Sequence, residues 1–145
     1  MTFEPLAVAQ GVALPSPAGL VVVRIGMEPG AVLPSDPADP TVGLIILEAG
    51  QLTVRLDAPI TVTRAGTFAP ALATAEAGGE FVPPEEAAAA GEAVTLRAGD
   101  VALFPPNAGG EIRNDGDERA VGLAFLVTPP EMGEMGTPAA ATPAA

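Results

Sequence analysis

From residue 20 onward, short runs of apolar and often β-branched residues alternate with glycine, proline and polar residues. Such runs are typical of β-strands, because branched side chains pack well on a pleated surface. Where apolar and polar residues alternate, as in Gln51–Leu56, the period of two indicates a strand with one buried face. The pattern predicts eight strands, at 20–25, 42–48, 51–56, 60–64, 93–97, 101–104, 111–113 and 120–127.

Turns are predicted at 28–30, at Ala49-Gly50 and at 114–117, where Gly, Pro, Asn and Asp gather. The tight turn at Gly50 favours a hairpin between strands 42–48 and 51–56. Residues 34–40 contain three prolines, each of which also restricts the residue before it. This segment is therefore predicted to be a loop.

Residues 65–91 lack the period of two and are rich in Ala, Gly and Pro. We expect an insertion or long surface loop there, with one helical turn at 85–90 and no other helix. Residues 1–19 are predicted to lie across a barrel edge, and 129–145 to form a disordered Pro/Ala-rich tail. The remaining part, 20–128, is predicted to be one all-β sandwich or barrel. Strands 20–25 and 120–127 are apolar on both faces, which predicts that a dimer partner covers the outer face.

Two segments carry glycine, proline and asparagine at regular intervals. In the first, Gly30 is followed by Asp36-Pro37-Ala38, then by Gly43 and Gly50. This spacing resembles the first motif of the cupin superfamily, which runs Gly, five residues, His-x-His, three or four residues, Glu, six residues, Gly. The first segment thus keeps the glycine frame of the motif but replaces its metal ligands.

The second segment contains Gly99, Pro105, Asn107, Gly110 and Asn114. It resembles the second cupin motif, which runs Gly, five residues, Pro-x-Gly, two residues, His, three residues, Asn. Asn107 stands at the second glycine of that motif and is tolerated in a left-handed turn. The resemblance implies a single cupin-like double-stranded β-helix, a jelly-roll barrel in which the two segments face each other.

The positions that hold a metal ion in cupins are occupied here by Asp36, Ala38, Gly43 and Gly110. Three of these residues offer no side-chain donor, whereas a first-row divalent metal needs about three protein ligands. The metal-dependent activities of cupins are therefore not expected, and no cofactor is predicted.

Composition removes further classes of chemistry, because the chain contains no His, Cys, Lys, Trp or Tyr. Catalytic triads, thiolate or imidazole zinc sites and Schiff-base lysines cannot be built from it. A carboxylate-only Ca²⁺ or Mg²⁺ site is left open. The net charge of −12 argues against nucleic acids and anionic membranes as partners. No signal peptide or membrane-spanning run is visible, and the cellular compartment stays undecided.

The candidate binding residues lie at the expected barrel mouth and interior. Asp36 and Asp39 either bind a cation or polar ligand at the mouth or, as we favour, shape their loop through bonds to its backbone. Alternation from Gly43 and Gly110 places three apolar residues inward, and directs Glu111 and Arg113 outward as an ion pair. The interior is then either open to an apolar molecule or a filled core, and we favour the filled core. The predicted site comprises Asp36, Asp39, Ile45, Leu47, Asn107, Gly110 and Ile112.

Two classes of function follow. The first is a metal-free, non-catalytic module that binds a small apolar or neutral molecule or serves in assembly, as a homodimer. The alternative is a carboxylate-based, metal-independent isomerase or lyase, with Asp36 or Glu111 as acid or base. No recognisable spacing of carboxylates supports the alternative, so the sequence favours the first class.

Overall fold

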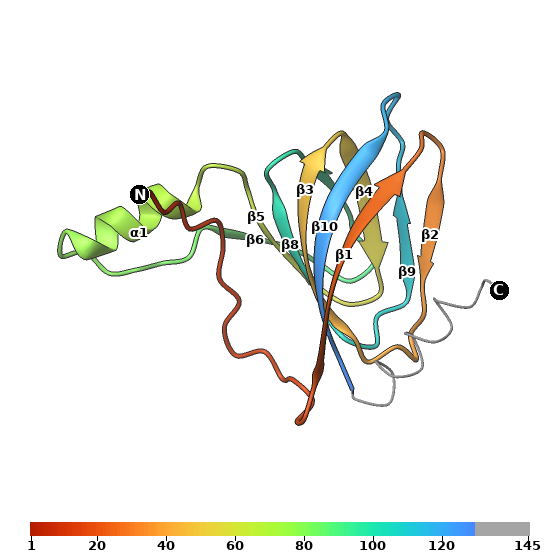
Figure 1. Cartoon of the computed structure of the whole chain (residues 1–145), viewed down its shortest axis with the longest axis horizontal. Coiled ribbons are helices and arrows are strands. Elements are labelled where there is room, and N and C mark those ends of the chain that lie inside the picture. The colour runs from red at the N-terminus through yellow and green to blue at the C-terminus, as the bar shows by residue number, and fades with distance from the viewer. Residues whose placement is uncertain (130–145) are drawn as a thin grey trace.

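A computed structural model describes residues 1–129 as two antiparallel sheets packed face to face (Figure 1). The six-stranded sheet runs in the order β1 (Gly19–Met27), β10 (Ala120–Thr128), β3 (Val42–Ala49), β8 (Val101–Phe104), β5 (Ile60–Thr63) and β6 (Glu85–Ala88). The four-stranded sheet runs in the order β2 (Val32–Ser35), β9 (Gly110–Arg113), β4 (Gln51–Leu56) and β7 (Ala93–Arg97). The predicted all-β jelly-roll barrel is confirmed.

Consecutive strands alternate between the two sheets, with β5 and β6 as the exception among the described strands. The predicted hairpin between 42–48 and 51–56 is therefore wrong. The chain turns at Gly50, but β3 pairs with β10 and β8, whereas β4 pairs with β7 and β9. Both strands have one strongly apolar face, and crossing from one sheet to the other lets each turn that face toward the shared core.

The core lies between the sheets and receives side chains from both. Its largest fully buried members are Leu47, Leu56, Ile60, Leu96 and Val54. Each such aliphatic side chain stabilises the fold by roughly 1.5–3 kcal/mol relative to exposure. The alternation seen in the sequence of β4 is borne out, since Leu52, Val54 and Leu56 are buried and Arg55 is exposed.

The insertion contains more regular structure than its sequence indicates. Helix α1 (Phe68–Glu76) lies where only a loop was expected, and its Pro70 falls in the first turn, where a backbone N–H is not needed. The predicted helical turn at 85–90 is wrong, because Glu85–Ala88 forms β6 and pairs with β5. Local helix propensity of the Glu-Ala run yields to strand pairing and to the burial of Ala88.

The predicted loop at 34–40 begins later than expected, because Pro34 and Ser35 belong to β2. Strand β2 is an edge strand of its sheet, where a proline removes no ladder hydrogen bond that the sheet requires. The turn positions of the two motifs are as predicted. Gly30, Gly50 and Gly99 have φ of 86°, 77° and 91°, and Asn107 has φ of 57°.

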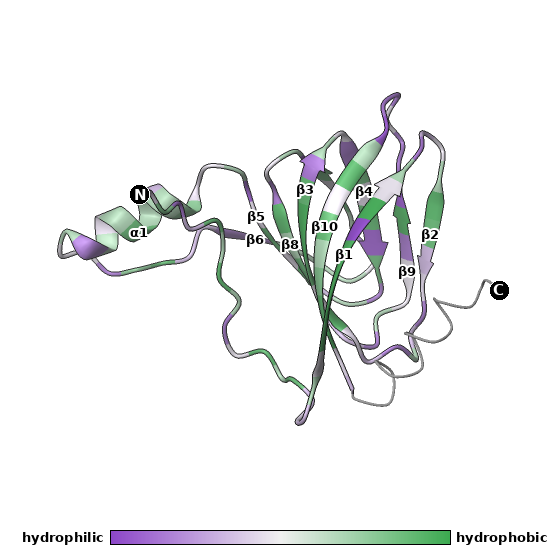
Figure 2. Cartoon of the chain, viewed as in Figure 1, coloured by the Kyte–Doolittle hydropathy of each residue, from purple (hydrophilic) through white to green (hydrophobic). Residues whose placement is uncertain are grey.

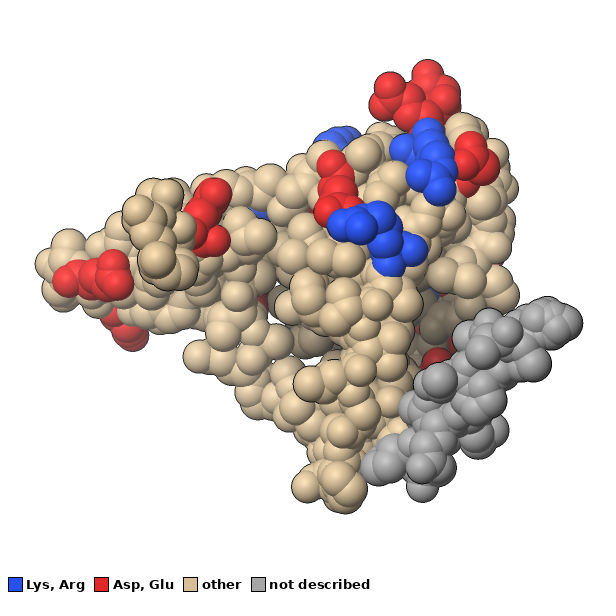
Figure 3. Space-filling view, viewed as in Figure 1, with Lys and Arg blue, Asp and Glu red and all other residues tan. Residues whose placement is uncertain are grey.

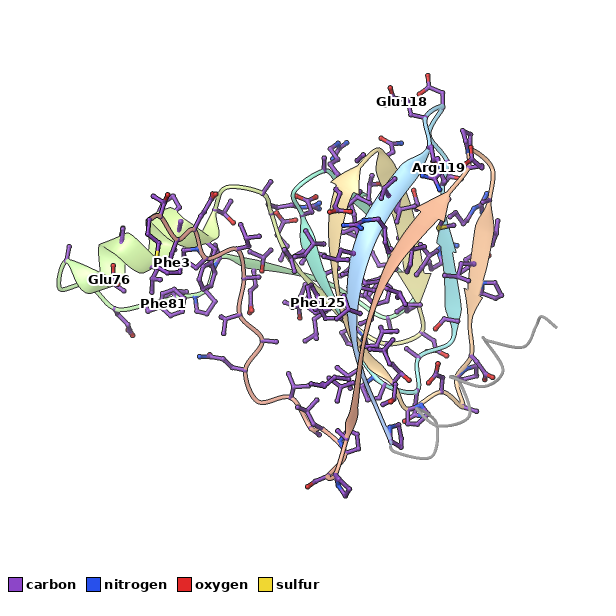
Figure 4. All side chains as sticks on the ribbon, viewed as in Figure 1. Phe3, Glu76, Phe81, Glu118, Arg119 and Phe125 are labelled. Atoms are coloured by element: carbon purple, nitrogen blue, oxygen red, sulfur yellow. The ribbon has the colours of Figure 1, made fainter. Side chains whose placement is uncertain are left out.

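Residues 1–18 form neither helix nor strand and run from the insertion to the start of β1 (Figure 1). Phe3 lies beside α1, where it lines a surface hollow together with Leu72 and Glu76 (Figure 4). Among the described residues, no helix has the length and hydropathy needed to span a membrane. The tail predicted at 129–145 falls outside the described residues from 130 onward.

A buried carboxylate, Asp100, ties the insertion to the barrel. Its Oδ2 accepts hydrogen bonds from Arg64 Nη1 at 2.7 Å and from the Arg97 N–H at 2.9 Å, and its Oδ1 accepts one from the Ala65 N–H at 2.9 Å. Burial acts to raise the pKa of Asp100. The N–H donors of Arg97 and Ala65 and the Arg64 guanidinium outweigh burial, so this pKa lies below its ordinary value.

Replacing Asp100 by asparagine is expected to lower the free energy of unfolding at neutral pH by about 2 kcal/mol, since an amide cannot accept all three bonds. A carboxyl with a lowered folded-state pKa stabilises above its unfolded pKa of about 3.9, and this contribution is lost as pH falls through the folded value. The difference between the two proteins should therefore shrink in acid. Urea titrations from neutral to acidic pH measure it. Asp115→Asn is the control, because it alters an exposed ion pair. An equal loss of unfolding free energy in that variant would contradict the stabilising role assigned to Asp100.

Candidate functional site

The two motif segments lie side by side within one barrel. Strand β3 of the first segment pairs with β8 of the second, with Gly43 opposite Phe104. In the other sheet β2 pairs with β9, with Ser35 opposite Gly110. The segments therefore meet in both sheets. Of the predicted site residues, Asp36, Asp39, Ile45 and Ile112 line one pocket, whereas Leu47 lies in the core.

This pocket of about 350 Å³ opens at one end of the barrel, which we call the barrel mouth. Its walls are apolar side chains from both sheets, among them Ile25, Leu33, Ile45, Phe104 and Ile112. Its polar residues are Ser35, Asp36, Asp39 and Thr41. The volume lies in the range of small-molecule sites, which run from about 300 to 1,000 Å³. The mouth therefore combines an apolar wall with a short polar rim.

The rim side chains bond to their own loop. Asp36 accepts a hydrogen bond from the Ala38 N–H at 2.8 Å, and Asp39 accepts one from the Thr41 N–H at 3.0 Å. Ser35 Oγ donates to the carbonyl oxygen of Ala108 at 2.7 Å. Bonds of Asp to the backbone two residues later are those of Asx turns. This arrangement is what the loop-shaping interpretation of Asp36 and Asp39 expects.

Asn107 joins the two motif segments across the mouth. Its backbone N–H donates to the carbonyl oxygen of Asp39 at 2.8 Å, and its Nδ2 donates to that of Pro37 at 3.2 Å. The side chain is exposed and holds the 36–40 loop rather than pointing into the pocket. Asn107 therefore positions the rim.

Deeper in the barrel, the interior is filled. Leu47 and Ile112 belong to the core cluster, and Ile45 is buried beside them at the mouth, as alternation along their strands predicts. A residual cavity between Met27, Leu52 and Leu96 measures only about 10 Å³. That volume is at or below what one water molecule requires. Within the barrel, space for a ligand is thus confined to the mouth.

The positions that carry metal ligands in cupins do not fit a metal here. Ala38 and Gly43 have no donor, and a Cβ at Gly43 would lie 3.1 Å from Leu126 Cδ2. At Gly110 a Cβ would lie 2.8 Å from the Cα of Leu56 and closer still to the carbonyl oxygen of Arg55. Asp36 alone keeps a carboxylate. Within residues 1–129, no three Asp or Glu side chains gather as a metal site would require.

Glu111 and Arg113 lie on the outward face of β9, as alternation from Gly110 predicts. Arg113 Nη1 lies 3.2 Å from Glu111 Oε2, and its Nε lies 3.4 Å from Asp115 Oδ1. These side chains are exposed, so each pair contributes little to stability. Neither residue faces the mouth pocket.

Sequence reasoning missed several wall residues of the mouth, among them Ile25, Leu33 and Phe104. Leu33 lies between a predicted turn and a predicted loop, where no alternation of apolar and polar residues indicated a strand. Phe104 was assigned to a strand, but its inward direction follows only from the pairing of β8 with β3. Two larger hollows, of about 660 Å³ and 590 Å³, open on the surface. The first lies beside Arg55 and Asp57 and shares Ser35 with the mouth, and the second lies between Phe3 and α1.

No protein-family profile and no curated protein matches the chain. Similar solved structures include the cupin domain of an XRE family transcriptional regulator from Enterobacter cloacae, with 16% identity and a TM-score of 0.44 over 75% of this chain and 95% of that one. A cupin domain-containing protein from Halorhodospira halophila shows 14% identity and a TM-score of 0.43, over 82% of this chain and 69% of that one.

RmlC from Streptococcus suis, solved in complex with dTDP-D-xylose, shows 13% identity and a TM-score of 0.40, over 75% of this chain and 43% of that one. The chain thus spans less than half of the RmlC chain. The strand order and the pairing of the two motif segments in both sheets make the fold a jelly-roll double-stranded β-helix, which is the fold that the resemblance to cupins predicts.

Proposed function

We propose that the chain is a non-catalytic, metal-independent binding protein whose barrel mouth takes a small, uncharged and largely apolar molecule. The observation that carries the proposal is the mouth pocket itself, with apolar walls and a rim whose side chains already bond to their own loop. An apolar pocket with few polar groups at its edge is the usual form of a small-molecule site.

The charge at the rim narrows the ligand class. Asp36 and Asp39 are the charged residues that line the mouth, and no arginine shares this lining among the described residues. A carboxylate or phosphate ligand would meet two negative charges without a cation to pair with. The rim therefore favours neutral over anionic ligands.

The alternative, a carboxylate enzyme, receives no support from the mouth. An acid or base catalyst needs a carboxyl directed at the bound substrate, within about 3 Å of the proton that moves. Asp36 and Asp39 point to backbone N–H groups of their own loop, and Glu111 pairs with Arg113 on the outer face. Among the described residues, none of the candidate carboxylates enters the apolar part of the pocket.

A matched pair of fluorescent probes tests the proposal. The neutral N-phenylnaphthylamine is expected to bind the purified chain, while the anionic anilinonaphthalene sulfonate binds more weakly. At a hundredfold excess over its Kd, a ligand that binds only the folded chain raises the free energy of unfolding by about 2.7 kcal/mol, which thermal denaturation records. Equal or preferential binding of the anionic probe would contradict the assignment of the ligand class.

Two neighbouring residues of β2 locate the binding. Leu33 is 42% exposed and lines the mouth, whereas Val32 is 51% exposed and lies outside its lining. Leu33→Glu is expected to raise the Kd of the neutral probe at least about tenfold, because a charge is introduced into an apolar wall of the pocket. Val32→Glu should leave the Kd unchanged. If the two variants behave alike, the probe binds elsewhere.

A further inference from the structure

The hollow beside Arg55 and Asp57, which we call the Arg55 hollow, lies at one end of the four-stranded sheet. Its volume of about 660 Å³ is within the range of small-molecule sites. Its lining comes from the last residues of β2 and β4, the first residues of β9 and the segment before β7. These strand ends meet because β9 is antiparallel to both β2 and β4. The hollow is therefore built by the sheet itself and not by one loop.

Part of the lining is bare backbone, supplied by Gly91, Gly109 and Gly110. A Cβ at Gly109 would lie 3.1 Å from Asp57 Oδ2 and 3.2 Å from Pro37 Cδ, and both of these residues also line the hollow. A larger residue at position 109 would thus occupy space between Asp57 and Pro37. Glycine leaves that space open.

The cation of the hollow is the guanidinium of Arg55. Alternation along β4 turns Arg55 outward and leaves it exposed, and Figure 2 shows hydrophilic and apolar residues in turn along this strand. Its neighbour on β7 is Ala93, which offers no polar side chain. Its neighbour on β9 is Glu111, whose Oε2 lies 3.2 Å from Arg113 Nη1. Neither cross-strand neighbour therefore neutralises Arg55.

Most arginines of the chain differ from Arg55 in this respect. All six arginines lie within the described residues, and four of them form ion pairs with carboxylates. Figure 3 shows such pairs as blue side chains beside red ones at the upper end of the barrel. Arg55 and Arg97 are the two without an ion pair in the described part of the chain, and only Arg55 lines the hollow.

The anion of the hollow is Asp57, which follows the last residue of β4. Its backbone N–H donates to the carbonyl oxygen of Gly109 at 2.8 Å, and its Oδ1 accepts from the Gly109 N–H at 2.8 Å. These bonds hold the exposed carboxylate in place. They leave Oδ2 without a hydrogen-bond donor among residues 1–129, so this oxygen is available to a ligand.

The two charges select a ligand that carries both signs. Glu111 also lines the hollow, but Arg113 offsets its charge. An anionic ligand would pair with Arg55 and meet the like charge of Asp57, and a cationic ligand would meet the reverse. A zwitterion satisfies both groups. A guanidinium binds a carboxylate through two parallel N–H···O bonds, and a carboxylate oxygen accepts from an ammonium group.

We propose that the Arg55 hollow binds a small zwitterion, a molecule with one ammonium and one carboxylate group, such as a dipeptide with free ends. Arg55 pairs with the carboxylate of this ligand, and Asp57 Oδ2 accepts from its ammonium group. The hollow is open to water, so these ion pairs stay partly hydrated and the binding is weak. The inference does not rest on the ligand proposed for the mouth.

Titration of the isotopically labelled full chain with glycylglycine tests the proposal by nuclear magnetic resonance. The Gly109 N–H is bonded to Asp57, so a ligand on this carboxylate should shift its amide signal. Two analogues each lack one charge: N-acetylglycylglycine keeps the carboxylate, and glycylglycinamide keeps the ammonium group. We expect saturable shifts with glycylglycine and a Kd at least about threefold higher for each analogue. No saturable shift, or an analogue that binds as tightly as glycylglycine, would overturn the proposal.

Matched substitutions locate the two charges. Arg55→Gln and Asp57→Asn should each raise the Kd of glycylglycine at least about threefold. Asparagine keeps an oxygen that can accept the Gly109 bond, so the loop retains its tether while the charge is removed. Arg97→Gln and Asp117→Asn are the controls, because each removes an exposed charge of the same sign outside the hollow. A control that raises the Kd as much as its counterpart would contradict a local site. The comparison of analogues on the unaltered protein decides the matter even where a variant does not fold.

Salt provides a second readout. Exposed ion pairs are screened by added salt, so the Kd of glycylglycine is expected to rise between low and high ionic strength. An affinity that is the same at both would show that the peptide is held by uncharged contacts, which contradicts the roles of Arg55 and Asp57.

Discussion

Replacing Gly110 by alanine is expected to lower the free energy of unfolding by roughly 3–5 kcal/mol, the largest effect of any single methyl group we foresee. Two costs combine. The φ of Gly110 is 144°, which side chains rarely adopt, and an added Cβ would meet the backbone of β4 at Arg55 and Leu56. Backbone atoms cannot rotate away, so the pairing of β9 with β4 must shift. Urea-induced unfolding measures the loss.

Gly30→Ala separates these two costs. Gly30 also has a positive φ, of 86°, but a Cβ there would meet nothing within 4 Å. This substitution should lower the free energy of unfolding by about 1–2 kcal/mol, which is the cost of the positive φ alone. If Gly110→Ala is no worse than Gly30→Ala, then the close approach of β9 to β4 does not constrain position 110.

Gly110 stands at a position that carries a metal ligand in the second cupin motif. In the cupin motif this position holds a histidine, yet the backbone here leaves no room for any Cβ. Placing a histidine at position 110 would therefore require β9 to move away from β4.

Replacing Asn114 by alanine is expected to cost roughly 3–4 kcal/mol, since several hydrogen bonds at a buried site lose their partner. The side chain is fully buried. Its Nδ2 donates to the carbonyl oxygens of Met27 and Glu118, both at 2.8 Å, and its Oδ1 accepts from the Gly116 N–H at 2.9 Å. One amide thus joins the end of β1 to the turn between β9 and β10.

Asn114→Asp distinguishes lost bonds from lost volume. Aspartate keeps the shape and the bond from Gly116, but its carboxylate faces two carbonyl oxygens, so we expect a loss close to that of alanine. Asn107→Ala is the control: Asn107 is exposed, and its left-handed φ of 57° should account for a cost of about 1 kcal/mol. Thermal denaturation of the three variants compares them. A nearly unchanged Asn114→Asp protein would show that packing, and not the bond network, matters at this position.

The sequence by itself determined eight of the ten described strands, the turn positions and the chemistry that is absent. Period-two alternation in β4 and the apolar runs of β3 and β10 mark strands locally, because side chains on a strand must alternate between two faces. Gly30, Gly50, Gly99 and Asn107 mark left-handed turns for the equally local reason that few other residues tolerate a positive φ. The absence of His and Cys excludes the chemistry of these side chains by composition alone.

Only the tertiary structure decided which strands pair and where space remains. The turn at Gly50 is compatible with a hairpin or with a crossing between sheets, and the choice depends on distant strands such as β10 and β9. The Glu-Ala run of β6 has helical propensity but pairs with β5. The filled interior and the open mouth likewise result from how distant side chains pack, which no local pattern encodes.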